Sequence, residues 1–347
     1  MKKHEFTWPL LGFLTGVFAA PQGARALQEA SSRRAFERWE KEGMRDRSVI
    51  YSNKDGVEQG IYRSVADGLA LSFIVLRADN PKGIVQIIHG AQEHKAYYRN
   101  FAERLVEAGY TVFLSDCRGH GDSVSEDHPR GHISSIDDAV IDQVAFAVYL
   151  KRRFPDLPLA LFGHSFGSIV ARNVMMEHDD LIDKLVMTGV AARPPYAETG
   201  RFWGYMESFY TGATNRGRFL TSMSWKMNET LKGSVDDEAF IRALKRDPKK
   251  VARYTNGGAM AMWEGASRLK DYRRYAVKNP DLSILALSGT DDPITGGMRG
   301  LADTAKTFSK LGYTGYEQRL FPHMNHDLIH SEGREYVFRE IVDFLDR

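Results

Sequence analysis

Apolar and polar residues follow one another along this chain in a pattern typical of an α/β protein. Short apolar runs suited to buried strands lie at residues 57–64, 69–77, 84–88, 111–115, 159–162, 184–188, 283–287 and 316–320. From residue 97 onward, segments with helical spacing separate these runs. The first two runs flank Asp67-Gly68 and are expected to pair antiparallel, whereas strands joined through helices pair in parallel. The pattern therefore predicts an eight-stranded, mostly parallel sheet with helices on both faces.

One predicted connection is far too long for a simple loop. The sixth strand ends near Thr188 and the seventh begins near Ser283, whereas connections in compact domains usually have about 4–6 residues. We expect residues 191–280 to form a helical lid inserted after the sixth strand. The core would then comprise residues 51–190 and 281–347.

The predicted lid is rich in large, flexible apolar side chains. Trp203 and Met206 belong to this set. Methionine and aromatic side chains suit a pocket that accommodates flexible chains, so we expect these two to line an acyl-binding wall.

Residues 1–50 precede the predicted core, and they have two interpretations. Lys2 and Lys3, followed by the apolar run 8–20 and small residues around Arg25, resemble a secretory signal peptide with a cleavage site. The alternative is a helix that lies on a membrane or on the lid, since a bilayer span takes about 20 apolar residues. Localisation stays open between the cytoplasm, a membrane surface and export.

Composition narrows the function classes. A net charge of +2 offers no electrostatic footprint for nucleic acid. The one cysteine, Cys117, cannot form an internal disulfide and is expected to be a buried thiol. No cluster of metal-binding residue types stands out, so neither a metal nor an organic cofactor is predicted. The sequence does not indicate the oligomeric state.

A candidate nucleophile lies at the end of the fifth predicted strand. Gly163-His164-Ser165-Phe166-Gly167 is a G-x-S-x-G sequence that follows an apolar run and precedes a helix-compatible one. A sharp strand-to-helix turn presents such a serine, and the flanking glycines allow close backbone approach. The context therefore favours a nucleophile elbow over an ordinary glycine-rich turn.

A candidate acid follows the seventh predicted strand, where α/β sheets place their sites. Asp291 and Asp292 compete for this role. Pro293 restrains Asp292 to an extended or turn conformation. We favour Asp292 and interpret Asp291 as a turn residue.

A candidate base lies on the loop after the last strand. His323, His326 and His330 are all in range, and their spacing would also suit a metal if the segment were helical. Pro322 and Asn325 favour a loop instead. We choose His326 as the base and expect His323 and His330 to be surface or supporting residues. In α/β-hydrolases the order is serine, acid, histidine, as here.

Stabilisation of a tetrahedral oxyanion usually takes two backbone N–H groups. One belongs to the residue after the nucleophile, here Phe166, and the other to the loop after the third strand. That strand runs into His89-Gly90-Ala91, so Ala91 is the expected second donor.

These segments together resemble the monoacylglycerol lipases and bacterial lysophospholipases, which group with serine aminopeptidase S33-like α/β-hydrolases. The matching stretches are His89-Gly90-Ala91-Gln92-Glu93-His94 with Tyr97 and Tyr98, Asp116-Cys117-Arg118-Gly119-His120-Gly121-Asp122-Ser123, the elbow at Ser165, Gly289-Thr290-Asp291-Asp292, and His326. The resemblance implies the α/β-hydrolase fold and a catalytic triad of Ser165, Asp292 and His326. We also expect His89, Gly90, Glu93 and His164 to contact substrate, although a local salt bridge between Glu93 and His94 is an equal alternative.

The expected function is hydrolysis of carboxylic esters of monoacylglycerol or lysophospholipid type through an acyl-enzyme. The expected partner is a small lipid ester, with transient contact with a membrane surface. An aminopeptidase of the same fold would need an acid that grips a free amino terminus, for which Glu93 and Glu198 are candidates. An acyl thioesterase and a non-catalytic binding protein remain further alternatives.

Overall fold

A single sheet of nine strands organises the molecule. The computed structural model describes residues 7–220 and 237–347, with side chains from residue 16 onward. Its strands are β1 (Ser48–Lys54), β2 (Val57–Arg63), β3 (Ala70–Leu76), β4 (Gly83–Ile88), β5 (Tyr110–Ser115), β6 (Leu159–His164), β7 (Lys184–Thr188), β8 (Ser283–Gly289) and β9 (Tyr316–Phe321). They lie in the order β1-β2-β3-β5-β4-β6-β7-β8-β9. The core sheet is that of an α/β-hydrolase.

The prediction of eight strands was wrong by one. The additional strand is β1, which pairs antiparallel with β2 at the edge of the sheet. None of its seven residues is fully buried. An edge strand of this kind lacks the apolar alternation by which a strand is detected in a sequence.

The sheet changes from antiparallel to parallel along its width. Strands β1, β2, β3 and β5 pair antiparallel, whereas β4 pairs in parallel with both β5 and β6, and pairing stays parallel through β9. Strand β4 therefore lies between β5 and β6. The chain passes from β4 to its neighbour on one side, β5, and then crosses to its neighbour on the other side, β6. The carboxyl ends of β4 and β6 flank this switch point, where open α/β sheets bind their ligands.

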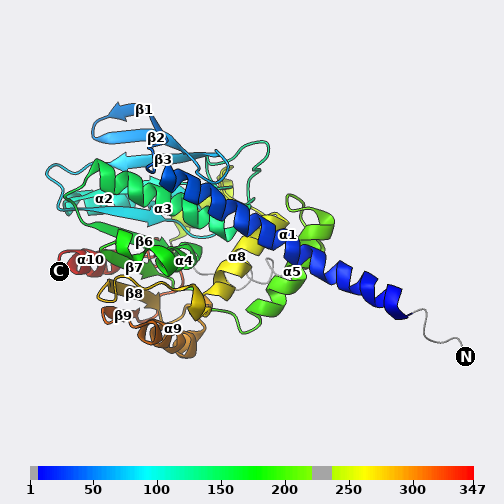
Figure 1. The fold of residues 1–347 in the computed structure, drawn as a ribbon. Helices are drawn as coiled ribbons and strands as arrows, with labels where there is room; N and C mark the ends of the chain where they lie inside the picture. The colour runs from blue at the N-terminus through cyan, green and yellow to red at the C-terminus, as the bar shows by residue number, and fades with distance from the viewer. Residues whose placement is uncertain (1–6, 221–236) are drawn as a thin grey trace, which may run out of the picture.

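Helices cover both faces of the sheet (Figure 1). One buried cluster holds side chains of α3 (Ile136–Arg153), α4 (Phe166–His178) and α9 (Gly297–Leu311), and a second holds side chains of α2 (Arg99–Glu107) and α10 (Arg334–Leu345). The β6 residues are all buried, which fits a strand covered on both faces.

The chain between β7 and β8 forms helices, as its length suggested. These are α5 (Ala197–Thr211), α7 (Glu238–Arg246) and α8 (Asn256–Arg268). Helix α5 packs on α8, and α8 packs on α4, the helix that follows Ser165. The interpretation of this segment as a lid stays a prediction.

The N-terminal segment forms a long helix, α1 (Thr7–Lys41), which packs on α3 and α5. Arg25 forms ion pairs with Asp137 of α3, at 3.1 Å, and with Glu264 of α8. Ser32 donates a hydrogen bond to Asp138 at 2.6 Å. Among the helices of the described residues, none combines the length and apolarity needed to cross a membrane.

Candidate active site

Ser165 occupies a strained turn between β6 and α4. Its φ is 51° and its ψ is −114°, a backbone conformation that residues other than glycine rarely adopt. A Cβ atom at Gly163 would overlap the carbonyl of Gly167, and one at Gly167 would overlap the carbonyl of Ile88. Both glycines are therefore required for this turn, which projects the Ser165 hydroxyl from the carboxyl end of β6.

Three side chains from distant parts of the chain form one hydrogen-bonded line. His326 Nε2 lies 2.8 Å from Ser165 Oγ, and His326 Nδ1 lies 2.9 Å from Asp292 Oδ2. Asp292 and His326 are both buried. This geometry allows the imidazole to accept the serine proton while the carboxylate holds its Nδ1–H.

The competing candidates lie elsewhere. Asp291 is exposed, and its carboxylate accepts a hydrogen bond from the hydroxyl of Thr290 at 3.0 Å. His323 is exposed as well. Asp292 is held by a second bond, because its Oδ1 accepts the N–H of Ile294 at 2.8 Å. Only Asp292 is therefore both buried and oriented toward His326.

Two backbone N–H groups are available beside Ser165. Phe166 is the first residue of α4, so its N–H has no acceptor within the helix. Ala91 follows β4, the strand next to β6, and its N–H donates to no group in the described part of the chain. Both residues have the character expected of oxyanion donors, and α4 adds the positive end of its dipole.

Glu93 and Tyr98 hold the loop that carries Ala91 through hydrogen bonds. The N–H of Gly90 donates to Glu93 Oε2 at 2.7 Å, and the Tyr98 hydroxyl donates to the same oxygen at 2.6 Å. Burial and the neighbouring Glu93 carboxylate raise the pKa of Tyr98, so its hydroxyl stays protonated. Glu93 is thus engaged with the loop and not with His94.

Removal of the Glu93 carboxylate is expected to lower kcat by about 10- to 100-fold with little change in KM, because small displacements of catalytic groups are costly. The variant is Glu93→Ala. Glu93→Gln, which keeps an accepting oxygen, should recover most of the loss. A raised KM with unchanged kcat would instead place Glu93 on the substrate, as the sequence suggested.

The loop is also tied to the segment between β7 and β8. The N–H of Gln92 donates to the Tyr254 hydroxyl at 2.6 Å, and that hydroxyl lies 2.8 Å from His120 Nε2. Asp247 lies 2.6 Å from His94 Nε2 and accepts a bond from Tyr97 at 2.7 Å. Tyr254 and Asp247 were not predicted, because no motif marks them and they lie far along the chain from the loop they hold.

His89 and His164 do not have the positions expected of substrate ligands. Both are buried. His89 Nε2 accepts the N–H of Cys117 at 3.0 Å, and its Nδ1 lies 2.8 Å from the carbonyl of Gly90. Burial lowers the pKa of His89, which keeps the ring neutral and able to bridge these groups. His164 Nδ1 lies 3.0 Å from the hydroxyl of Thr188. These rings hold loops together.

Trp203 and Met206, the two side chains assigned to an acyl wall, differ in exposure. Trp203 is 49% exposed and makes an edge contact with Phe202 on the surface of α5. Met206, one turn further along, is partly buried. The assignment of Trp203 and Met206 to an acyl wall stays a prediction.

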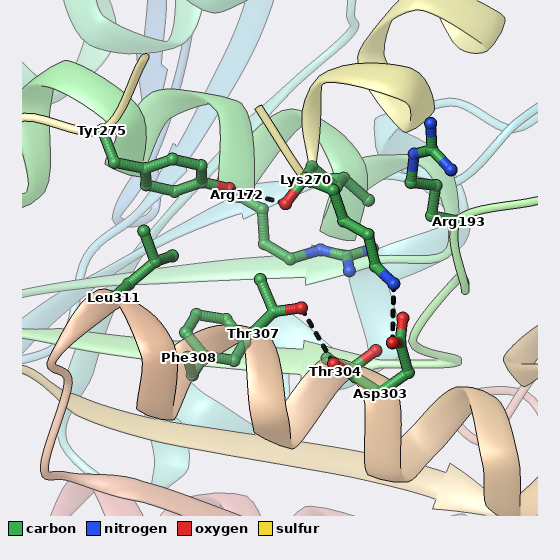
Figure 2. Close-up of a pocket in the computed structure, with 10 residues that line it drawn as sticks. Arg172, Arg193, Lys270, Tyr275, Asp303, Thr304, Thr307, Phe308 and Leu311 are labelled. Carbon is green, nitrogen blue, oxygen red and sulfur yellow. Dashed lines mark hydrogen bonds and ion pairs between the residues drawn. The ribbon is translucent and has the colours of Figure 1, made fainter. Parts of the chain in front are cut away.

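The buried side chain of Arg172, on α4, lines a cavity that residues of α9 also line (Figure 2). Arg172 Nε donates to the carbonyl of Ser168 at 3.0 Å, and its Nη2 donates to the carbonyl of Ala191 at 2.6 Å. The Ser168 hydroxyl donates to the carbonyl of Ser165 at 2.7 Å. Burial lowers the pKa of Arg172 to about 10, so it stays charged at neutral pH. This network ties α4 to the loop after β7 and supports the turn at Ser165.

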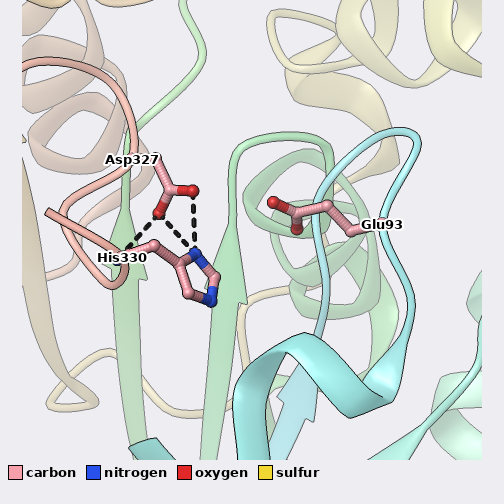
Figure 3. Close-up of side chains that lie close together, drawn as sticks. All are labelled: Glu93, Asp327 and His330. Carbon is pink, nitrogen blue, oxygen red and sulfur yellow. Dashed lines mark hydrogen bonds and ion pairs between the residues drawn. The ribbon is translucent and has the colours of Figure 1, made fainter. Parts of the chain in front are cut away.

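Glu93, Asp327 and His330 form the one group within the described residues whose atoms lie close enough for a shared metal ion (Figure 3). His330 Nδ1 lies 2.8 Å from Asp327 Oδ2, and its Nε2 lies 2.8 Å from the carbonyl of Tyr97. Burial would lower the pKa of His330, but Asp327 outweighs it and raises this pKa to about 9. Within this group, His330 and Asp327 form a buried ion pair.

This ion pair predicts a specific pH dependence of stability. The pKa of His330 rises from 6.5 to about 9 on folding, so its contribution is complete below about pH 6.5 and is lost as pH rises through 9. Between pH 7 and 10, wild type should lose on the order of 2 kcal/mol more of its free energy of unfolding than His330→Asn. Urea titrations at both pH values measure this difference, and parallel pH profiles would contradict it.

Comparisons with known proteins agree with this architecture. Residues 79–333 match the family model described as serine aminopeptidase, S33. A monoacylglycerol lipase of Mycolicibacterium smegmatis is 30% identical over 278 residues, which cover 77% of this chain and 89% of that protein. A phospholipase of Bacillus subtilis is 39% identical over 95 residues, which cover 27% of this chain and only 35% of that protein. The mouse monoglyceride lipase is 31% identical over 34% of this chain and 39% of its own length.

Solved structures show the same fold. A thermostable carboxyl esterase from Bacillus coagulans superposes with a TM-score of 0.75 at 18% identity, over 84% of this chain and 99% of that one. The monoacylglycerol lipase of Paleococcus ferrophilus superposes with a TM-score of 0.60 at 22% identity, over 79% of this chain and 98% of that one. At these identities the likeness concerns the fold alone.

Proposed function

The chain belongs to the serine aminopeptidase S33 family of α/β-hydrolases, and from this premise we propose that it is a serine hydrolase of carboxylic esters. The proposed substrates are monoacylglycerol or lysophospholipid-type esters, in keeping with the names of its relatives. The observation that carries the proposal is the hydrogen-bonded line of Ser165, His326 and Asp292 beside two available backbone N–H groups.

In the proposed reaction Ser165 Oγ attacks the acyl carbonyl carbon while His326 Nε2 takes the hydroxyl proton. Asp292 stabilises the imidazolium through Nδ1, and the N–H groups of Ala91 and Phe166 bind the oxyanion. Collapse of the tetrahedral intermediate expels the alcohol, which receives the proton from His326. Water, activated by the same imidazole, then hydrolyses the acyl-enzyme.

The peptidase alternative is less well supported by the side chains present. Glu93 accepts hydrogen bonds from Gly90 and Tyr98, and Glu198 pairs with Arg193 at 3.0 Å and Arg201 at 2.8 Å. A carboxylate that is to bind a free amino terminus must be available to it. Glu93 is therefore not available, and Glu198 would have to leave two surface ion pairs, which favours ester hydrolysis over aminopeptidase activity.

A substrate panel tests this proposal. The panel contains 2-oleoylglycerol, lysophosphatidylcholine, oleoyl-CoA, p-nitrophenyl butyrate and an aminoacyl anilide. We expect turnover of the lipid esters and the p-nitrophenyl ester, and the better lipid identifies the head group. Turnover of the anilide alone would reassign the protein to the peptidases, and a preference for oleoyl-CoA would make it a thioesterase.

A further inference from the structure

A buried cation on α4 lacks an acidic partner. Arg172 is 6% exposed, and it forms no ion pair with any group in the described part of the chain. Other buried arginines are paired. Arg118 lies 2.8 Å from Asp142, and Arg268 lies 2.6 Å from Asp137. Because a charge loses its hydration in a protein interior, it is normally compensated there by an opposite charge.

The tyrosines beside Arg172 do not supply that charge. Tyr275 and Tyr316 are the ionisable groups that act on the guanidinium. Burial raises the pKa of Tyr275 above its usual range and the pKa of Tyr316 to about 12, so both hydroxyls are neutral at physiological pH. The described residues therefore leave the charge of Arg172 uncompensated.

One end of the guanidinium also lacks a hydrogen-bond acceptor. Nε and Nη2 of Arg172 donate to the carbonyls of Ser168 and Ala191, whereas Nη1 donates to no group in the part of the chain that the structure describes. Figure 2 shows the guanidinium directed into the cavity that Lys270 and Thr307 also line. The two N–H groups of Nη1 are thus available to an occupant of this cavity.

The charge and size of the cavity indicate what that occupant is. Arg193 and Lys270 line the cavity together with Arg172, whereas Asp303 is the one carboxylate among the described residues that line it, and it pairs with Lys270 at 2.6 Å. The space open to a water-sized molecule measures about 20 Å³. A space of this size holds about one or two such molecules. The cavity therefore suits a small, singly charged anion and is too small for phosphate.

We propose that this cavity binds a monovalent anion of the size of chloride, which pairs with Arg172 through Nη1. A water molecule would accept the same hydrogen bond but would leave the charge uncompensated. Arg172 holds Ser168 and Ala191, and the Ser168 hydroxyl donates to the carbonyl of Ser165 at 2.7 Å. The anion would therefore stabilise the packing of α4 against the loop after β7. The proposal does not depend on the reaction at Ser165.

Anomalous diffraction tests the site directly, with bromide as the probe. Crystals of the full wild-type chain grown with sodium bromide should show an anomalous peak in the cavity, in contact with Arg172 Nη1. Bromide peaks confined to the protein surface, or a cavity that holds only water, would overturn the proposal. This test needs no variant to fold.

Thermal unfolding tests the same site in solution. Replacement of about 100 mM sodium gluconate by sodium chloride should raise the melting temperature of wild type by about 2–4 °C, because a ligand that binds the folded state stabilises it. Gluconate keeps the ionic strength constant and is too large for the cavity. Arg172→Met should lose this response. Arg339→Met is the matched control and should keep it, because Arg339 is exposed on α10 and does not line the cavity.

A second variant keeps the solution test decisive if Arg172→Met does not fold. Thr307→Leu retains Arg172 but fills part of the cavity that Thr307 lines, so it should fold and lose the chloride response. An equal chloride response in wild type and Thr307→Leu would show that chloride acts elsewhere on the protein and would overturn the proposal. Absence of any response in wild type would overturn it as well.

Discussion

Ser165→Ala is expected to lower the kcat/KM for ester hydrolysis by about 10⁴-fold or more and to leave the protein folded. The hydroxyl is the only part of the side chain that the variant removes, and the strained backbone at φ 51° already carries a Cβ atom. The oxyanion donors at Ala91 and Phe166 would remain, so a low residual rate above water is expected. Turnover of p-nitrophenyl butyrate and the melting temperature measure the two effects.

A matched control for this variant is Ser309→Ala, because Ser309 is exposed on α9 and outside the site. It should keep wild-type activity. If Ser165→Ala kept more than about a tenth of the wild-type rate, nucleophilic attack by Ser165 would be excluded, since removal of a nucleophile costs far more than that.

Asp292→Asn is expected to lower kcat by about 10³- to 10⁴-fold, whereas Asp291→Asn should stay within about threefold of wild type. The amide of asparagine would favour the wrong tautomer of His326, whose Nδ1 now lies 2.9 Å from Asp292. Asp291 is exposed, and its carboxylate accepts a hydrogen bond only from the neighbouring Thr290 hydroxyl in the described part of the chain. Steady-state kinetics on one ester compare the two isosteric variants directly, and the opposite ranking would assign the acid to Asp291.

The main features of the fold could be predicted because they depend on local patterns. A strand covered on both faces, such as β6, appears as an apolar run, and the turn at Ser165 requires glycines at defined spacing. The edge strand β1 escaped detection because its apolar run, Val49 to Tyr51, is short and does not alternate with polar residues. Local pattern therefore predicts what is buried better than what lies at an edge.

The surroundings of Ser165 were harder to predict, because a motif shows which residues are near a site but not which way they face. His89 and His164 are adjacent to the site in sequence, yet their rings hold neighbouring loops. Trp203 lies on the exposed surface of α5, which the composition of the segment could not distinguish from its inner one. Tyr254 braces Gln92 from a remote segment, a contact that only the three-dimensional fold brings about.

Covalent labelling with a fluorophosphonate tests most directly whether Ser165 is an activated nucleophile. We expect one adduct per chain, on the peptide that contains Ser165, with esterase activity lost in proportion to labelling. His326→Ala should slow the labelling strongly, because the serine would lose the base that lies 2.8 Å from its hydroxyl. A folded, active protein that stays unlabelled, or that loses activity through an adduct at another residue, would show that Ser165 is not the nucleophile.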